Sequence, residues 1–467
     1  MLRIYCDKNI FSLIKEHKPS FKADLKRTLE DLKDKMIFVY SYAHHQDLAN
    51  SKKEYWDEDL AILETYVKNH YLDYNAIKKF TEFCLFKPAQ SFYNIDFEAG
   101  KKAMNDSLNF IKDAFSGLDD DTEKVFSDFF NQFLQTPVQG LDNGNLKDEK
   151  EKEWVNKIFP TDKNSTIGDF IYQMYAFGSK LLNDRNEVKE IKKMMEDYVN
   201  SDNYSFEKWK DDFNEKFKDS FHGRSFTDLM EQVFNSVEYY NEYDKFGMFY
   251  NSLELYNVTK DKRLRDTQNL NSINTDANHA WFASFTDYLV TDDKGMAAKA
   301  YITYKYFKID TKILLTQEFI NHRAIILNQE EYNIKKFLKT LKYEEGNSLV
   351  LRKNENINSI ILKPQHKFFN YFNRISISNK KITLYCQRHK NANSVIYPEI
   401  EMLVYKLIKL FGVDTHNKGF YNLEKERDID SEFIRQWNFK DIKIEFKEGN
   451  NNDGNCLSLD VIFNDDY

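Results

Sequence analysis

Short, mostly apolar runs alternate with polar stretches over the first 75 residues. Leu2–Tyr5 and Met36–Tyr40 are such runs, typical of strands that are buried on both faces of a parallel sheet. Between them, the polar stretch Phe21–Lys35 predicts a helix. Ser41 directly follows the second run, where a serine can cap the next helix. This alternation predicts the first part of an α/β domain over residues 1–75.

The same alternation returns over residues 266–325. Two helix–strand pairs are expected there: Thr275–Ser284 with Tyr288–Thr291, and Lys294–Phe307 with Lys312–Leu315. Helices and strands at this spacing favour parallel crossovers, so residues 1–75 and 266–325 are predicted to form one domain. Between the two parts, over residues 76–265, apolar side chains recur at spacings of three and four. That spacing predicts an all-helical insertion.

Residues 326–467 show a third pattern, in which short β-like runs surround a long helix. The runs are Ser348–Arg352, Ser359–Lys363, Arg374–Ser378, Lys381–Cys386, Ile442–Phe446 and Cys456–Phe463. A helix is expected over Pro398–Phe411, because proline suits the first turn of a helix. This part of the chain is predicted to be an α+β accessory domain.

Length, cysteine content, apolar runs and net charge limit the classes of protein to which this chain can belong. A chain of 467 residues is long enough for two or three domains. The four cysteines are widely scattered and form no CxxC pair, which disfavours zinc and favours reduced thiols. We see neither a signal-peptide pattern nor an apolar run of about 18 residues, so we expect a cytoplasmic protein with no membrane partner. The net charge of −8 provides no general attraction to nucleic acid.

Four aspartates are expected to meet at one edge of the predicted parallel sheet. Asp7 follows the first strand, and Asp47 lies about a turn and a half into the helix after the second. Asp276 lies at the start of a later predicted helix, and Asp293 follows the strand after that helix. The carboxyl ends of parallel strands form a natural crevice. Carboxylates there could hold Mg²⁺ or Mn²⁺, ions that promote phosphodiester hydrolysis.

The order of these acids resembles the PIN-like nuclease superfamily. That family has an Asp after the first strand, an acid in an early helix, an Asp opening a later helix, and Thr-x-Asp after the fourth strand. The matching positions here are Asp7, Asp47, Asp276 and Thr291-Asp292-Asp293. The spacing Ser41-x-x-His44-x-x-Asp47, with Asp replacing the more usual Glu, resembles a bacterial PIN-like branch. The resemblance covers about 130 of the 467 residues, in two pieces.

The resemblance implies a PIN-like parallel sheet flanked by helices, and a metal-dependent endonuclease that more often acts on RNA. Asp7, Asp47, Asp276 and Asp293 would be the catalytic and metal-binding residues. Ser41, His44, Thr291 and Asp292 would support these ligands without binding the ion. Simpler roles remain open for several of these residues. Asp7 and Asp276 could cap helices, Asp47 could be an exposed helix residue, and His44 could be structural.

The stretch 351–400 carries nine basic and two acidic residues, a local charge of +7 in an acidic chain. Phe368, Phe369, Tyr371, Phe372 and Tyr385 are interleaved with the basic residues. Basic groups with stacking aromatics suit a single strand of nucleic acid. We expect Asn9, Lys380, Lys381, Arg388 and Lys390 to contact the substrate. The alternative is that the aromatics form a core and the lysines a solvated surface.

The leading hypothesis is therefore a metal-dependent endonuclease of PIN-like type that cleaves single-stranded RNA. A second hypothesis, from another class, is a catalytically inactive nucleic-acid-binding or scaffold protein on the same fold. A third is a regulated toxin or defence effector that is silenced by a protein partner. The insertion could gate the site, bind that partner or mediate self-association. Convergence of the four aspartates on one point would distinguish the first hypothesis from the second.

Overall fold

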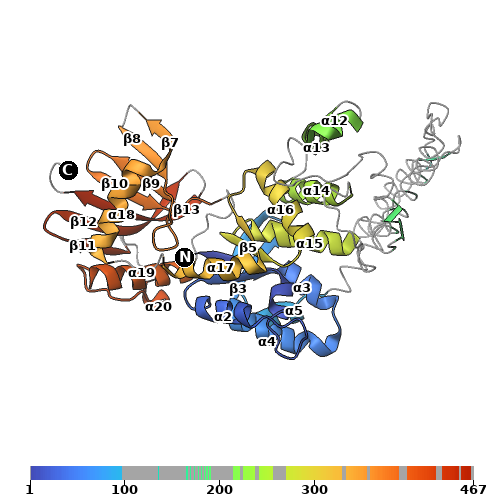
Figure 1. Cartoon of the computed structure of the whole chain (residues 1–467), viewed down its shortest axis with the longest axis horizontal. Coiled ribbons are helices and arrows are strands. Elements are labelled where there is room, and N and C mark those ends of the chain that lie inside the picture. The colour runs from blue at the N-terminus through green and yellow to red at the C-terminus, as the bar shows by residue number, and fades with distance from the viewer. Residues whose placement is uncertain are drawn as a thin grey trace, which may run out of the picture.

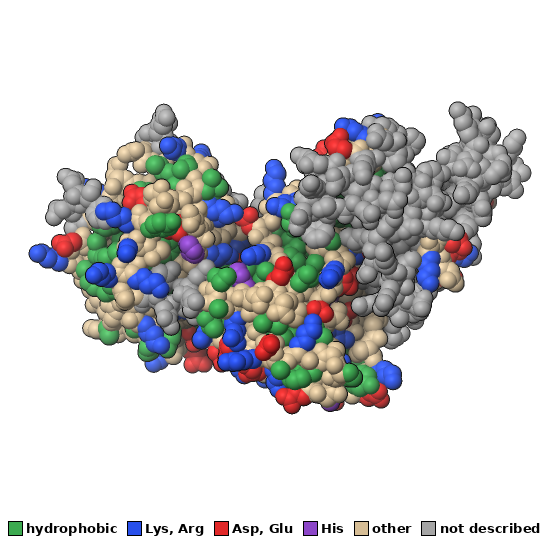
Figure 2. Space-filling model, viewed as in Figure 1, with side chains coloured by type: hydrophobic (Ala, Val, Ile, Leu, Met, Phe, Trp, Pro, Cys, Tyr) green, Lys and Arg blue, Asp and Glu red, His purple; other side chains and the backbone are tan. Residues whose placement is uncertain are grey.

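The computed structural model contains two β-sheets that form separate lobes (Figure 1). It describes residues 2–96, 214–220, 224–236, 241–255, 270–328, 333–354, 358–388, 397–426, 434–451 and 454–463, with isolated positions between 135 and 190. A mixed six-stranded sheet is built from residues at both ends of the predicted insertion. An antiparallel seven-stranded sheet is built from the last part of the chain. Figure 2 shows the surface hollowed between the two lobes.

The six-stranded sheet has the order β4-β3-β2-β1-β5-β6. Its strands are β1 Arg3–Cys6, β2 Ile37–Ser41, β3 His70–Asn75, β4 Phe80–Leu85, β5 Tyr288–Thr291 and β6 Lys312–Leu315. The central strand β1 pairs in parallel with β2 on one side and with β5 on the other. Strands from residues 1–75 and from residues 266–325 therefore share one sheet. All residues of β1, β2 and β5 are buried, which explains why their sequences do not alternate.

Helices cover both faces of this sheet. They are α1 Lys8–Ser12, α2 Ala23–Leu32, α3 Tyr42–Ala49, α4 Trp56–Val67, α5 Pro88–Tyr93, α14 Glu242–Leu255, α15 Leu270–Ala283, α16 Lys294–Phe307 and α17 Thr316–Asn328, with a short 3-10 turn at Lys53–Tyr55. The β1–α2–β2 and β5–α16–β6 connections run toward opposite edges of the sheet. Because such crossovers are right-handed, α2 and α16 lie on opposite faces. On the α16 face, α14 and α15 pack against α16.

The prediction of an all-helical insertion over residues 76–265 is wrong at its start. Residues 80–85 form β4, which pairs antiparallel with β3. The prediction rested on apolar side chains at spacings of three and four along the insertion. In this strand, however, Thr81 is the buried residue, and its hydroxyl accepts a hydrogen bond from Trp281. Farther along, α12 Glu215–Ser220 and α13 Phe226–Ser236 are helical as expected. Helix α14 belongs to the sheet domain, since Phe246 and Tyr250 join its core.

The last part of the chain forms a second sheet, which is antiparallel and packs with helices, so it contains both the strands and the long helix that were expected there. Its order is β11-β12-β13-β10-β9-β8-β7, with strands β7 Leu349–Asn354, β8 Ser359–Lys363, β9 Arg374–Ser378, β10 Lys381–Tyr385, β11 Arg435–Asn438, β12 Ile442–Asn451 and β13 Gly454–Phe463. Helices α18 Ile334–Asn347 and α19 Tyr397–Phe411 contribute apolar side chains to its core, and α20 Leu423–Glu426 is a single turn. Strand β11 was not predicted. Among the described residues, no helix is long and apolar enough to cross a membrane.

Candidate active site

Asp7 lies at the carboxyl end of the central strand, where it joins two neighbouring strands. Its carboxylate is 3% exposed and accepts hydrogen bonds from the Thr291 hydroxyl and the Asn9 backbone N–H. The second bond makes Asp7 the N-cap of α1, so the capping alternative is also correct. Thr291 is the last residue of β5 and thus orients Asp7 as expected. Burial raises the pKa of Asp7 to about 6, against opposing effects of His279 and these hydrogen bonds.

Asp293 and Asp292 follow β5 at the same edge of the sheet. The Asp293 backbone N–H donates to the Thr291 hydroxyl oxygen over 3.0 Å, and its carboxylate caps α16 through the Met296 N–H. Asp292 is 43% exposed and accepts a 2.6 Å hydrogen bond from the Thr316 hydroxyl. It also forms a 3.0 Å ion pair with Lys22. Asp292 is therefore engaged outside the cluster, and its expected role as a support of the ligands stays a prediction.

Asp47 is joined to the first strand through a histidine that sequence reasoning missed. The Asp47 Oδ2 lies 3.0 Å from Nε2 of His279, and Nδ1 of His279 lies 2.7 Å from the Tyr5 hydroxyl. The Tyr5 hydroxyl also lies 2.7 Å from Oγ of Ser41. Burial disfavours the charged form of His279, but its bond to Asp47 and the nearby aspartate charges hold its pKa above the usual value. The one available signal was its position one turn after Asp276.

His44 is structural, and it connects α3 to the first strand. Its Nδ1 accepts the Ser41 backbone N–H over 3.1 Å, which leaves Nε2 to donate to the Cys6 carbonyl at 2.8 Å. The Ser41 side chain accepts the Ala43 N–H, so Ser41 caps α3 as predicted. Burial holds the pKa of His44 well below its usual value. His44 is thus a neutral support for the helix that carries Asp47.

Asp276 does not open its helix, so the capping alternative is wrong. Helix α15 begins at Leu270, which places Asp276 in its second turn, on the same face as His279. Burial raises the pKa of Asp276 to about 7, with Lys299 opposing the shift and the charges of Asp293 and Asp47 adding to it. Lys299 is itself buried and forms an ion pair with Glu254 of α14.

The four aspartates thus gather at the carboxyl edge of the sheet and act on one another electrostatically. The charge of Asp47 raises the pKa of both Asp7 and Asp276. Among the described residues, neither Asp7 nor Asp276 has a Lys or Arg partner within 4.0 Å. Among the described residues, no three or more His, Cys, Asp or Glu side chains lie close enough together to hold a metal ion as they stand. The donor set, carboxylate oxygens with excess negative charge, suits Mg²⁺ or Mn²⁺.

The residues predicted to bind nucleic acid do not form one surface. Asn9 is exposed at the start of α1, beside Asp7. Lys380 is exposed between β9 and β10, and Lys381 pairs with Asp460 over 2.8 Å. Both lysines lie on the seven-stranded sheet. Lys390 lies outside the described residues.

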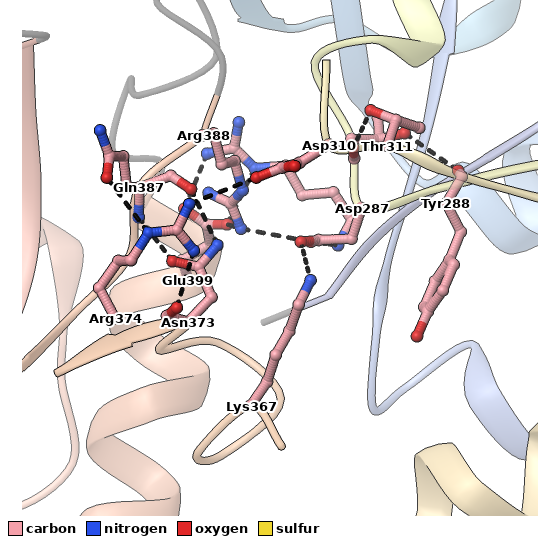
Figure 3. Close-up of polar contacts among 12 residues, drawn as sticks. Asp287, Tyr288, Asp310, Thr311, Lys367, Asn373, Arg374, Gln387, Arg388 and Glu399 are labelled. Atoms are coloured by element: carbon pink, nitrogen blue, oxygen red, sulfur yellow. Dashed lines mark hydrogen bonds and ion pairs between the residues drawn. The ribbon is translucent and has the colours of Figure 1, made fainter. Parts of the chain in front are cut away.

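Arg388 and the interleaved aromatics have structural roles, which corrects two expectations. The Arg388 side chain is 7% exposed and pairs with Glu399 at 3.0 Å and with Asp287 at 3.5 Å, between the two lobes (Figure 3). Such a group cannot meet a phosphate at the surface. Phe368, Phe369, Tyr371 and Phe372 belong to the core of the second lobe. The alternative that these aromatics form a core is therefore correct for these four.

Known proteins provide no further guide to this site. The chain matches no protein-family model, no curated protein and no solved structure. The resemblance in the order of the acids therefore stays a prediction, and the activity must be argued from the residues at the carboxyl edge of the sheet.

Proposed function

We propose that the protein is a metal-dependent phosphodiesterase, and specifically an endonuclease of PIN-like type that acts on single-stranded RNA. One observation carries the proposal: aspartates from two parallel strands and two helices gather at one sheet edge. Two of them, Asp7 and Asp276, lack a described cationic partner. Burying carboxylates in this way is unfavourable unless a cation offsets the charge. A purely structural cluster would be expected to pair each buried carboxylate directly with a lysine or arginine.

Asp7, Asp47, Asp276 and Asp293 would hold Mg²⁺ or Mn²⁺. When bound, the ion would supply an activated water and neutralise charge on the phosphodiester. The chain's own residues orient the ligands. Thr291 fixes one oxygen of Asp7, and His279 fixes one oxygen of Asp47. Tyr5 in turn holds His279 through its other ring nitrogen.

Lys299 limits the negative charge of the cluster. It lies beside Asp276, whose pKa it lowers, and pairs with Glu254 at the same time. Because the charge of Lys299 is shared between Asp276 and Glu254, it reduces the repulsion among the aspartates but does not neutralise them. The cluster therefore keeps the excess negative charge that a divalent ion requires.

The substrate is proposed from the family resemblance together with the exposed polar groups. Asn9 is exposed beside Asp7 and could donate to a phosphate. Lys380 and Lys381 remain candidates for contact with the strand, although they lie on the second lobe. Arg388 is excluded from this role by its burial.

The test is cleavage of labelled single-stranded RNA and DNA with Mn²⁺, with and without EDTA. Wild type should cleave RNA only with metal, and Asp7→Asn should reduce the rate by roughly a hundredfold or more, because it alters a ligand and not merely a support. Asp292→Asn is the matched control, since Asp292 is exposed and paired with Lys22. It should retain most activity.

Two outcomes would overturn the proposal. Equal cleavage by wild type and Asp7→Asn would place the activity elsewhere or in a contaminant. Metal-independent RNA binding without cleavage would favour the inactive binding protein instead. Preferential cleavage of DNA would correct the substrate while keeping the reaction.

A further inference from the structure

A polar cleft of about 190 Å³ lies between the two lobes, at the sheet edge opposite the aspartate cluster. The first lobe supplies the segments that precede β5 and β6, including Asp287 and Asp310. The second lobe supplies the end of β8, the following loop and the residues that flank β9 and β10. Figure 2 shows Lys and Arg side chains gathered in the hollow between the lobes, and Figure 3 shows the polar contacts around it.

The side chains that line this cleft carry a net positive charge. Lys363, Lys367, Arg374 and Arg388 line it, against the acids Asp287 and Asp310. Four cations and two acids leave a charge of +2. A small, partly enclosed site with this charge favours an anion over a cation or a neutral molecule.

Asp287, one of the two acids, is buried and held in place by hydrogen bonds and ion pairs. It accepts the Arg3 backbone N–H at 2.8 Å and pairs with Lys367 at 2.5 Å. Burial alone would raise the pKa of Asp287, but Lys367 and Arg388 hold it well below its usual value. This carboxylate is therefore the fixed counter-charge for two of the four cations.

The other acid is loosely held. Asp310 is 61% exposed, and its carboxylate lies 3.5 Å from Nζ of Lys363 and 3.3 Å from Nη2 of Arg374. Arg374 is fixed in place, because its guanidinium also donates to the Asn373 carbonyl at 2.8 Å and to Gln387 at 3.2 Å. An exposed carboxylate thus lies between one rigid and one flexible cation, where another oxyanion could replace it.

A buried hydroxyl group without a hydrogen-bond partner among the described residues belongs to a residue that lines this cleft. Ser284 lines the cleft, is 3% exposed, and its Oγ has no hydrogen-bond partner among the described residues. Buried hydroxyls are normally paired, so this one is consistent with a missing partner. The cleft volume equals that of about six liquid waters, enough for a phosphate and a small organic group but not for a nucleic-acid strand.

We propose that this cleft binds a small phosphate-bearing molecule, with the phosphate displacing the Asp310 carboxylate from between Lys363 and Arg374. The ligand would bridge the two lobes, since both cations belong to the second lobe and Ser284 on the other side of the cleft belongs to the first. Binding to the folded state alone would stabilise the protein. The site is independent of the aspartate cluster and needs no divalent ion.

The experiment measures thermal unfolding of the full chain in EDTA with increasing inorganic phosphate, at ionic strength held constant with chloride. Wild type should show a saturable rise in melting temperature. Lys363→Gln should weaken the phosphate affinity by about three- to tenfold, because it removes a charged donor. Asp310→Asn should strengthen it, because it removes the competing carboxylate. Both side chains are exposed enough for the fold to tolerate the change.

Lys339→Gln is the control, because it removes an exposed lysine of the same lobe that does not line the cleft. A parallel titration compares ribose 5-phosphate with inorganic phosphate, and ribose is the control without phosphate. Tighter binding of ribose 5-phosphate than of inorganic phosphate would identify a phosphorylated small molecule, and equal binding of the two would identify phosphate itself. Binding of ribose as tight as that of ribose 5-phosphate would contradict the proposal. The proposal fails if the melting temperature does not saturate, if all variants respond equally, or if Asp310→Asn weakens the affinity.

Discussion

Asp276→Asn and Asp287→Asn should change stability in opposite directions, although both alter aspartates of the same α15–β5 segment. Asp276 lies among like charges at the carboxyl edge of the sheet, and its pKa is raised from 3.8 to about 7 by burial. Asp287 lies at the opposite edge among cations, and its pKa is held well below normal by Lys367 and Arg388 against the effect of burial. Asparagine keeps the shape of each side chain and removes the charge.

The magnitude for Asp276 follows from its pKa. A rise of about three units at about 1.4 kcal/mol each makes the charged form about 4 kcal/mol less favourable at pH 8, as an upper bound. The side chain is partly solvated, which reduces the effect. We expect Asp276→Asn to stabilise the metal-free protein by about 1–3 kcal/mol at pH 8. Between about pH 4 and 7 the folded state keeps a proton that the unfolded state has lost, so the gain should fall to about a third of its size at pH 5 and vanish only below about pH 4.

Asp287→Asn should show neither the gain nor the pH dependence. Its depressed pKa provides stability that is fully present above the unfolded value near 4 and lost only at more acidic pH. Removing the charge leaves Lys367 and Arg388 without their shared partner, at a cost of about 3–5 kcal/mol. That loss should be the same at pH 5 and pH 8.

The assay is urea unfolding of wild type and both variants in EDTA at pH 5 and pH 8, repeated at pH 8 with millimolar Mn²⁺. Manganese should stabilise wild type and Asp287→Asn, and should stabilise Asp276→Asn much less, because a proposed ligand is gone. Destabilisation by Asp276→Asn in EDTA at pH 8 would refute the reasoning. So would a gain of equal size at pH 5, since most of the cost of keeping this aspartate protonated in the folded state develops between pH 5 and 7.

Three further outcomes are expected. Thr291→Val should weaken Mn²⁺ binding by roughly 10–100-fold in calorimetry, because it frees Asp7 from its orienting bond; an unchanged affinity would remove Thr291 from the site. Glu399 is paired with Arg3. Burial alone would raise the pKa of Glu399, but the charges of Arg3 and Arg388 lower it to about 2. Stability should therefore fall as pH drops from about 4.5 toward 2, and Glu399→Gln, which is less stable at neutral pH, should show a smaller fall in acid unfolding. Replacing Lys380 and Lys381 with Glu should weaken single-stranded RNA binding and flatten its salt dependence, measured by fluorescence anisotropy; unchanged binding would exclude this part of the second lobe.

The strands could be predicted wherever burial alone determines the sequence pattern. In β1, β2 and β5, every residue is buried, so short apolar runs mark them clearly, and the predicted bounds of β5 and β6 agree with the structure. The parallel pairing of these strands could also be predicted, because a helix between two strands implies a parallel crossover. Asp7 and Asp293 could be placed at one edge for the same reason, since both directly follow parallel strands.

Other features depend on partners that are distant in sequence, and only the tertiary structure decided them. Residues 80–85 form a strand because β3 offers an edge, although their spacing suggested a helix. His279 belongs to the cluster because α15 packs against α3 and places the histidine beside Asp47, 232 positions away in the chain. Arg388 connects the two lobes because its guanidinium pairs with Asp287 of the first lobe and with Glu399 of the second. A sequence pattern records how buried a residue is, whereas the partner of a buried charge is set by which surfaces pack together.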